Sequence, residues 1–207
     1  MSFVDRYRRA GLDGNPFAAP QRPDERPPHF VDRGFGDAPS PGRNTFVQVI
    51  GDSGFGKSTQ LVHWRAAEPG PYHYIPRAPY RDRWAAPPVD SLVYGDEIDR
   101  MPMLLRAKWF RALATSGATL VAGTHEDLAA AAHRAGFSVV THRLAPLTAP
   151  QVRDLLDGTL NASGTPTVRF SDADVDRITE RSGGIPREAC VIAHALLAER
   201  VAEYSKT

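Results

Sequence analysis

The sequence has one cysteine, Cys190, among its 207 residues. No intrachain disulfide can form from a single cysteine, which is typical of a protein of a reducing compartment. No stretch approaches the roughly 20 apolar residues that a membrane span requires, and residues 1–19 contain no apolar core of signal-peptide length. The sequence therefore predicts a cytoplasmic protein that does not contact membranes.

A strong charge of either sign is also missing, because the formal net charge is +1. Such a chain has no overall attraction to nucleic acid or to anionic membranes, and only a local basic patch would provide one. The composition, 42% hydrophobic and 24% charged, is that of a soluble globular protein. The length favours one domain, or one domain with a small appendage.

Residues 51–58 read G-D-S-G-F-G-K-S, a complete G-x-x-x-x-G-K-[ST] phosphate loop. The glycines allow the backbone N–H groups to turn inward around a polyphosphate. Lys57 is expected to reach the β- and γ-phosphates, and Ser58 to hold a magnesium ion through its hydroxyl. We expect nucleotide contacts from the whole loop and the residue after it: Gly51, Asp52, Ser53, Gly54, Phe55, Gly56, Lys57, Ser58 and Thr59.

The neighbouring sequence supports this interpretation. Residues 45–50 predict a largely buried parallel strand, and residues 57–67 predict a helix that ends before a Pro-Gly-Pro segment. The alternatives are a degenerate loop that no longer binds, and a protease. Residues 51–54 resemble the nucleophile segment of trypsin-like proteases, but the residues that follow complete a phosphate loop and begin a helix.

Residues 91–95 form another apolar strand pattern, which ends in Asp96 and Glu97. In a phosphate-loop fold, a carboxylate at this point faces the magnesium ion, which Asp96 can orient. Glu97 can polarise the water that attacks the γ-phosphate. The alternative is a helix N-cap with first-turn acids, for which Asp99 is the better candidate.

The next buried strand, at residues 118–123, is followed by Thr-His-Glu-Asp. Two interpretations of Thr124 stay open. It forms a capping box with Asp127, or it lies beside Glu97 and helps to place the attacking water. The pair His125-Glu126 does not extend to H-E-x-x-H, because Ala129 holds the last position. A zinc protease site is therefore not expected.

The rest of the chain predicts three regions: a proline-rich segment at 1–41, a phosphate-loop core at 42–146 and a small helical domain at 147–207. The first region is expected to be irregular apart from a short helix at 6–12, and either to be a floppy leader or to pack beside the nucleotide base. Within the core, helices are predicted at 102–116 and 128–135 and a last strand at 137–144.

Residues 77–84 interleave arginines with aromatic residues between helix-breaking prolines. Charge and stacking together suit the binding of nucleic acid or of a peptide. The alternative is an ordinary loop in which the arginines pack on the aromatic rings.

Taken in order, these motifs resemble those of the AAA+ ATPase family over residues 14–202. Residues 51–58 resemble Walker A, residues 92–97 resemble Walker B, and Thr124 resembles sensor 1. The G-G-I-P-R run at 183–187 is similar to the sensor 2 motif of initiators, clamp loaders and transposition-type ATPases. Asn15-Pro16-Phe17 resembles the segment that flanks adenine in that branch.

The resemblance implies an α/β fold with a five-stranded parallel sheet, a helical lid and ATP between them. It also implies that Pro16 and Phe17 contact the base and that Arg187 contacts the γ-phosphate. Ring or spiral assembly is implied as well, with an arginine from a neighbouring subunit completing the site. The sequence departs from the family at Gly95, lacks a normal helix after the second strand, and has no clear arginine finger. Three arginines are rivals for that role: Arg134, Arg106 and Arg111.

These features predict a magnesium-dependent ATPase that acts as a switch or motor on a protein or DNA partner, bound through residues 77–84. The alternative is an adaptor that binds ATP but hydrolyses it weakly. A small-molecule kinase is less favoured, because the helical region lacks the arginine-rich pattern of a lid that closes over an acceptor.

Overall fold

The computed structural model describes residues 3–18 and 25–204, which divide into two compact units. Among the described residues, a sheet unit contains 25–26 and 33–144, and a helical unit contains 3–18, 27–32 and 145–204. The irregular structure predicted around Pro20 and Pro23 lies outside the described residues. No described helix combines the length and the apolar composition that a membrane crossing requires.

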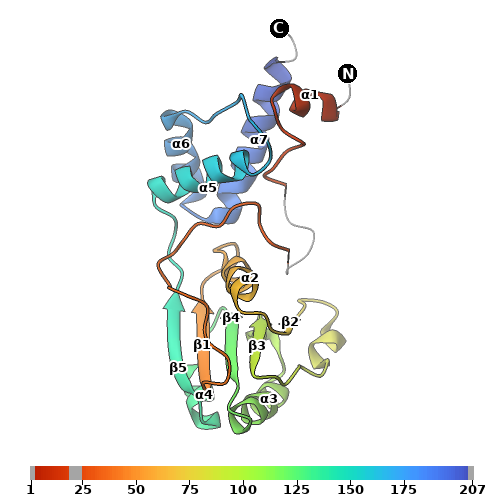
Figure 1. Cartoon of the computed structure of the whole chain (residues 1–207), viewed down its shortest axis with the longest axis vertical. Coiled ribbons are helices and arrows are strands. Elements are labelled where there is room, and N and C mark those ends of the chain that lie inside the picture. Colours follow the sequence, from red (N-terminus) through yellow and green to blue (C-terminus); the bar gives the residue numbers. More distant parts are fainter. Residues whose placement is uncertain (1–2, 19–24, 205–207) are drawn as a thin grey trace. The chain divides into compact units, whose positions relative to one another are not determined.

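The sheet unit is built on five parallel strands in the order β2-β3-β4-β1-β5 (Figure 1). This arrangement confirms the predicted α/β fold with a five-stranded parallel sheet. The strand bounds are β1 Thr45–Ile50, β2 Tyr72–Tyr74, β3 Leu92–Asp96, β4 Thr119–Thr124 and β5 Ser138–Arg143.

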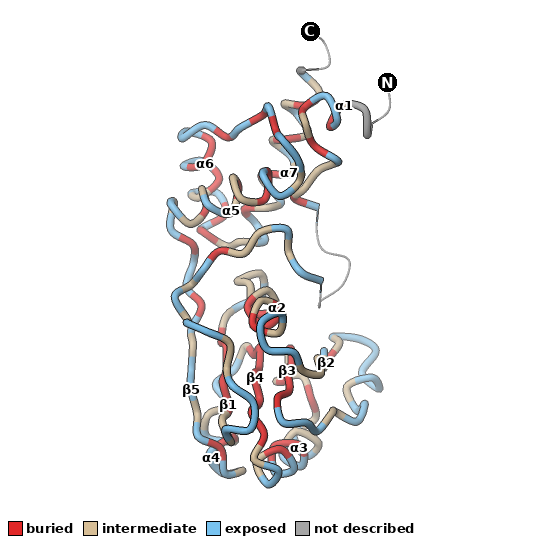
Figure 2. The backbone as a smooth tube through the Cα atoms, viewed as in Figure 1, coloured by how far each residue is buried: buried red, intermediate tan, exposed pale blue. Residues whose placement is uncertain are grey.

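Helices cover both faces of this sheet. Helix α2 (Lys57–Ala67) contributes to one apolar cluster, while α3 (Met103–Thr115) and α4 (Ala129–Ala135) contribute to the cluster on the other face. Along β1, Phe46 belongs to the α3 and α4 side, and Val47 belongs to the α2 side. Strands that are buried on both faces need apolar residues at nearly every position. The central strands β1, β3 and β4 are accordingly buried along most of their length in Figure 2, whereas the edge strand β5 has no buried residue.

The register of the strands brings their carboxyl ends together. Asp96 of β3 lies opposite Gly123 of β4, and Thr124 of β4 lies opposite Ile50 of β1. The segments that follow β1, β3 and β4 therefore meet at one edge of the sheet, which is where open α/β sheets place their ligands. Two of the connections contain a short 3-10 helix. Helix η1 (Tyr80–Trp84) lies between β2 and β3, and helix η2 (Ile98–Arg100) follows β3.

The helical unit consists of α1 (Phe3–Arg9), α5 (Ala149–Asn161), α6 (Asp172–Ser182) and α7 (Pro186–Tyr204). Helix α6 begins with a capping box between Ser171 and Asp174. Described residues near the N-terminus are packed rather than floppy, since Tyr7, Leu12 and Phe17 lie in the core of this unit.

Candidate functional site

The phosphate loop connects β1 to α2 as the sequence predicts. Gly54 and Gly56 have φ values of 89° and 98°, a region that side chains disfavour and glycine tolerates. Gly56 is the N-cap of α2 and forms no side-chain capping hydrogen bond. No side chain of the N-cap residue therefore occupies the first backbone N–H groups of α2. These groups lie at the positive end of the helix dipole, as phosphate binding requires.

Lys57 is the first residue of α2, and its side chain is 4% exposed. The ammonium donates to Gly51 O at 2.8 Å and Asp52 O at 3.3 Å, and it lies 3.0 Å from His125 Nε2. Burial lowers the pKa of Lys57, against the nearby carboxylates that raise it. Phosphate binding requires this ammonium to exchange its present acceptors for phosphate oxygens.

Asp96 ends β3 and is fully buried. Its Oδ2 accepts hydrogen bonds from Ser58 Oγ at 2.6 Å and Tyr72 Oη at 2.8 Å, and its Oδ1 accepts none among the described residues. A Cβ at Gly123 would lie 2.5 Å from Oδ1, so only glycine leaves room for this carboxylate. Burial raises the pKa of Asp96, opposed by both hydroxyl hydrogen bonds and by Lys57.

A hydroxyl and a carboxylate at this spacing are hard oxygen donors of the kind that magnesium binds. The unsatisfied Oδ1 is a further observation in favour of a cation, because buried carboxylate oxygens normally have a partner. Ser58 and Asp96 therefore fit the predicted magnesium site. Tyr72 is an additional member of this group that the sequence did not predict.

Glu97 follows Asp96 with φ 58° and ψ 35°, in the left-handed region that non-glycine residues rarely adopt. Its side chain is 12% exposed and forms ion pairs with Lys57 at 3.7 Å and Arg100 Nη2 at 3.0 Å. Burial raises the pKa of Glu97, and the charge of Lys57 opposes this effect. A buried carboxylate with a raised pKa is suited to accept a proton.

Asp99 is not a helix cap, so that choice of capping residue is wrong, although Glu97 is the N-cap of η2 and Asp99 lies in its first turn. Helix α3 begins at Met103 with Pro102 as its N-cap. Instead, Asp99 Oδ1 accepts the backbone N–H of His125 at 3.2 Å, and its Oδ2 lies 3.2 Å from His125 Nδ1. No spacing in the sequence signals this pair, because it depends on the ends of β3 and β4 being neighbours.

Thr124 is fully buried, and its hydroxyl is engaged locally. Its Oγ1 donates to Glu126 O at 2.9 Å and accepts the Glu126 N–H at 3.1 Å. The capping box with Asp127 is wrong, since α4 begins at Ala129 and Asp127 accepts the Ala129 N–H instead. The side chain that reaches Glu97 from this strand end is His125, with Nδ1 3.0 Å from Glu97 Oε2.

Glu97, Asp99 and His125 also have the donor atoms of a metal site, within 4.8 Å of one another. However, Lys57 and Arg100 already place two cations beside Glu97. Charge balance is thus reached without a metal ion, and the group is better described as an ion-pair network at the strand ends.

Three of the predicted site residues, Pro16, Phe17 and Arg187, lie in the helical unit. The Asn15 side chain donates to Tyr7 Oη and His194 O, and Phe17 is 4% exposed with an edge-to-face contact to Phe170. These contacts give the Asn15-Pro16-Phe17 segment a structural role, and its contact with adenine stays a prediction.

The local structure likewise explains why glycine is present at positions 183 and 184. Gly183 caps α6 in the left-handed region, and a Cβ at Gly184 would lie 2.4 Å from Leu147 O. Arg187 is an exposed residue in the first turn of α7. Its predicted contact with the γ-phosphate stays a prediction.

The loop at 77–84 combines both interpretations of its arginines. Arg83 donates to Pro76 O and Arg77 O and lies over the Tyr80 ring at 5.0 Å, so it holds the loop together. By contrast, the Arg81 side chain is 87% exposed, and Trp84 is exposed as well. Arg81 and Trp84 are therefore the side chains that a partner could reach.

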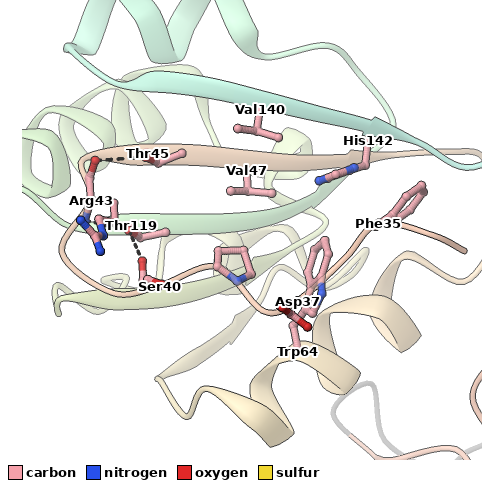
Figure 3. A pocket seen from close by; sticks show the side chains of 11 residues that line it. Phe35, Asp37, Ser40, Arg43, Thr45, Val47, Trp64, Thr119, Val140 and His142 are labelled. Atoms are coloured by element: carbon pink, nitrogen blue, oxygen red, sulfur yellow. Dashed lines mark hydrogen bonds between the residues drawn. The ribbon is translucent and has the colours of Figure 1, made fainter. Parts of the chain in front are cut away.

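A cavity of about 350 Å³ lies over β1 and β5 beside α2 and shares no residue with the phosphate loop. In Figure 3, Phe35, Trp64 and His142 gather at one end of the cavity, and Arg43 and Thr119 lie at the other. Phe35 and His142 pack with their ring centroids 4.6 Å apart. No pattern in the sequence predicts this cavity.

Solved structures with the same fold include RuvB from Thermotoga maritima, a Holliday junction branch migration motor. That structure superposes with a TM-score of 0.54 at 21% identity, over 72% of this chain and 53% of RuvB. Two single-residue variants of the same protein give TM-scores of 0.56, at 21% and 18% identity, over 72% of this chain and 53% and 54% of theirs. No protein-family model and no curated protein sequence matches this chain.

The chain therefore has an α/β fold with a five-stranded parallel sheet, as found in RuvB. It spans about half of the length of the RuvB chains that it matches. At this level of identity the likeness shows the fold alone.

Proposed function

We propose that this protein binds ATP with magnesium at residues 51–58 and hydrolyses it. The observation that carries the proposal is the 2.6 Å hydrogen bond between Ser58 of the phosphate loop and Asp96 of β3. It joins the two halves of a phosphate-loop site, while Glu97 lies within 3.7 Å of Lys57.

The roles follow from the positions of these side chains. Ser58 and Asp96 would hold magnesium, which neutralises phosphate charge. Lys57 would bind the β- and γ-phosphates, and Glu97 would accept a proton from the attacking water. Arg187 would bind the γ-phosphate and Pro16 with Phe17 the base, with the helical unit acting as the lid. The similarity of G-G-I-P-R to the initiator, clamp-loader and transposition branch supports this part of the proposal.

We further propose that hydrolysis drives a switch or motor action on DNA or a protein partner in the cytoplasm. The exposed Arg81 and Trp84 suit such a partner, because cations and aromatic rings together bind single strands. The fold of a branch migration motor is compatible with this proposal.

Assembly into a homo-oligomer is proposed from the family resemblance. Of the three rival arginines, Arg106 donates to Ile98 O and Asp99 O and is thus used within its own subunit. Arg134 and Arg111 are exposed and are the better candidates to reach a neighbouring subunit.

A weakly hydrolysing adaptor is the second candidate. It is favoured by the contacts between Lys57 and its acceptors Gly51 O, Asp52 O and His125, which phosphate binding must break. Such contacts oppose nucleotide binding and would lower basal turnover.

Calorimetry with magnesium ATP tests the binding site. Lys57→Ala removes the one cationic side chain of the loop, so the affinity should fall by at least about tenfold, equivalent to about 1.4 kcal/mol. Lys108→Ala, an exposed lysine on α3, is the control and should bind as the wild type does. Equal affinities for the wild type and Lys57→Ala would contradict the assignment.

A further inference from the structure

His125 occupies an unusual position between a cation and two carboxylates. Its Nε2 lies 3.0 Å from Lys57 Nζ, and its Nδ1 lies 3.2 Å from Asp99 Oδ2 and 3.0 Å from Glu97 Oε2. Asp99 contacts both the ring and the backbone of His125, because its Oδ1 also accepts a hydrogen bond from the His125 backbone N–H at 3.2 Å. The imidazole is thus oriented by Asp99 and placed beside the proposed base.

These contacts fix the tautomer of the ring. An ammonium group can only donate hydrogen bonds, so Nε2 must accept from Lys57. The proton of a neutral imidazole then lies on Nδ1, where Asp99 Oδ2 accepts it. In this tautomer Nε2 is an acceptor that faces the phosphate-loop lysine.

Glu97 provides the other acceptor at this place, and its Oε2 lies on the Nδ1 side of the ring. This oxygen is buried and accepts no hydrogen bond among the described residues, although its ion-pair partners Arg100 and His125 lie 3.0 Å away. A buried carboxylate oxygen of this kind calls for a donor. The other oxygen of Glu97, Oε1, lies 3.7 Å from Lys57 Nζ, and His125 Nε2 lies 3.0 Å from the same ammonium. Two acceptors, Nε2 and Glu97 Oε1, therefore lie beside Lys57.

We propose that His125, held by Asp99, is the second acceptor that orients the attacking water, and that it takes up this role when Lys57 turns to the phosphates. The inference rests on the proposed ATPase function. When the Lys57 ammonium moves away from His125 Nε2, the lone pair of Nε2 becomes available beside Glu97. Asp99 still fixes the orientation of the ring.

The chemistry requires two acceptors. An attacking water directs one lone pair at the γ-phosphorus, so both of its O–H groups need acceptors elsewhere. Glu97 accepts one proton as the new P–O bond forms and the bond to the β–γ bridging oxygen breaks, and the bridging oxygen leaves with that electron pair. His125 Nε2 accepts a hydrogen bond from the second O–H. Thr124 is not suited to this role, because its hydroxyl already donates to Glu126 O and accepts the Glu126 N–H.

Asp99→Asn gives a test that does not depend on activity. If the oxygen of the introduced amide still accepts the hydrogen bond from the backbone N–H of His125, its NH₂ group faces Nδ1. Because NH₂ can only donate, Nδ1 must then accept, and the ring proton moves to Nε2. Nitrogen NMR of ¹⁵N-histidine-labelled protein without nucleotide, with His125→Gln used to assign the signal, should show the Nδ1–H tautomer in the wild type and the Nε2–H tautomer in Asp99→Asn. A wild-type ring that is protonated on Nε2, or doubly protonated, would overturn the proposal.

Turnover gives the second test. His125→Ala and Asp99→Asn should lower kcat by about 100-fold, the size of effect that loss of orientation produces, without weakening ATP binding, since neither change removes a proposed phosphate ligand. His125→Gln carries an amide oxygen that can take the place of Nε2, so it should recover part of that loss. Glu126→Gln, an exposed side chain in the same connection, is the matched control and should turn over ATP as the wild type does.

The outcomes separate the two proposals. A wild type that neither binds nor hydrolyses ATP would overturn the proposed function, and the NMR comparison would still test the Asp99–His125 geometry. An active wild type with unchanged kcat in His125→Ala and Asp99→Asn would overturn the role of His125 and leave the ATPase proposal intact. Equal loss of kcat and of ATP affinity would likewise contradict it, as it would indicate general damage to the site.

Discussion

Two adjacent acidic residues at the end of β3 have different environments. Asp96 is fully buried and bonded to two hydroxyl groups, whereas Glu97 lies among Lys57, Arg100 and His125. Burial raises the pKa of both carboxyl groups. The two hydroxyl donors stabilise the charged form of Asp96, which suits it to hold a cation as a carboxylate. At Glu97 burial outweighs the opposing charge of Lys57, which suits this carboxylate to accept a proton.

Gly123→Ala tests the space around Asp96. The new Cβ would lie 2.5 Å from Asp96 Oδ1 and 3.5 Å from Lys57 Cβ, so the carboxylate must move from Ser58. We expect the free energy of unfolding to fall by about 1–3 kcal/mol, the usual cost of overpacking, and magnesium-dependent nucleotide binding to weaken. Urea unfolding and calorimetry measure both effects.

Gly14→Ala is the control for that change, because a Cβ at Gly14 meets nothing within 4 Å. If Gly123→Ala had the stability and magnesium dependence of the wild type, the tight packing around Asp96 would be refuted.

Prediction from the sequence works at the residue scale where spacing alone defines a role. Lys57 and Ser58 are adjacent in a loop of fixed length, and Asp96 follows an apolar strand, so their proximity follows from the fold class. Asp99 and His125 have no such signal. Their contact arises because the connections after two neighbouring strands meet, and that depends on backbone geometry which no motif records.

At the scale of elements, the connection after β2 replaces a helix by the short 3-10 helix η1. The prolines of this stretch made the absence of a normal helix predictable. The sequence does not predict which of its arginines bind the backbone of the loop and which are exposed, because this depends on which backbone carbonyl each guanidinium reaches. Arg83 reaches Pro76 O, and Arg81 extends outward.

Substitutions in η1 should therefore separate binding from loop structure. The double variant Arg81→Ala with Trp84→Ala should weaken DNA binding and remove partner-stimulated turnover while leaving basal turnover unchanged. Fluorescence anisotropy with single-stranded DNA over a range of salt concentrations provides the measurement, since loss of a phosphate contact lowers the salt dependence.

Arg83→Ala serves as a contrast in the same loop. It removes the bonds to Pro76 O and Arg77 O, so it should increase proteolytic cleavage within residues 77–84. Unchanged DNA affinity and salt dependence in the double variant would show that Arg81 and Trp84 bind no nucleic acid.

At the scale of the whole molecule, the chain has a sheet unit that carries the phosphate loop and a helical unit that carries Arg187. A nucleotide can shift a conformational equilibrium only by binding one state more tightly than another. If Arg187 contacts the γ-phosphate, ATP and ADP must differ in their effect on the arrangement of the two units.

Arg187→Ala should then abolish the difference between the ATP and ADP states in small-angle scattering and sedimentation. Arg181→Ala, an exposed arginine in the last turn of α6, is the control and should keep that difference. A variant at Arg187 that still responds to ATP as the wild type does would rule out a sensor role for this residue.

ATP binding and phosphate release by Glu97→Gln, measured beside the wild type, show whether Glu97 is the base in ATP hydrolysis. Glutamine keeps the size of the side chain but cannot accept the proton. We expect ATP binding to persist and phosphate release to fall by about two to four orders of magnitude, the usual contribution of a general base. Phosphate release by Glu97→Gln at the wild-type rate would contradict this role of Glu97.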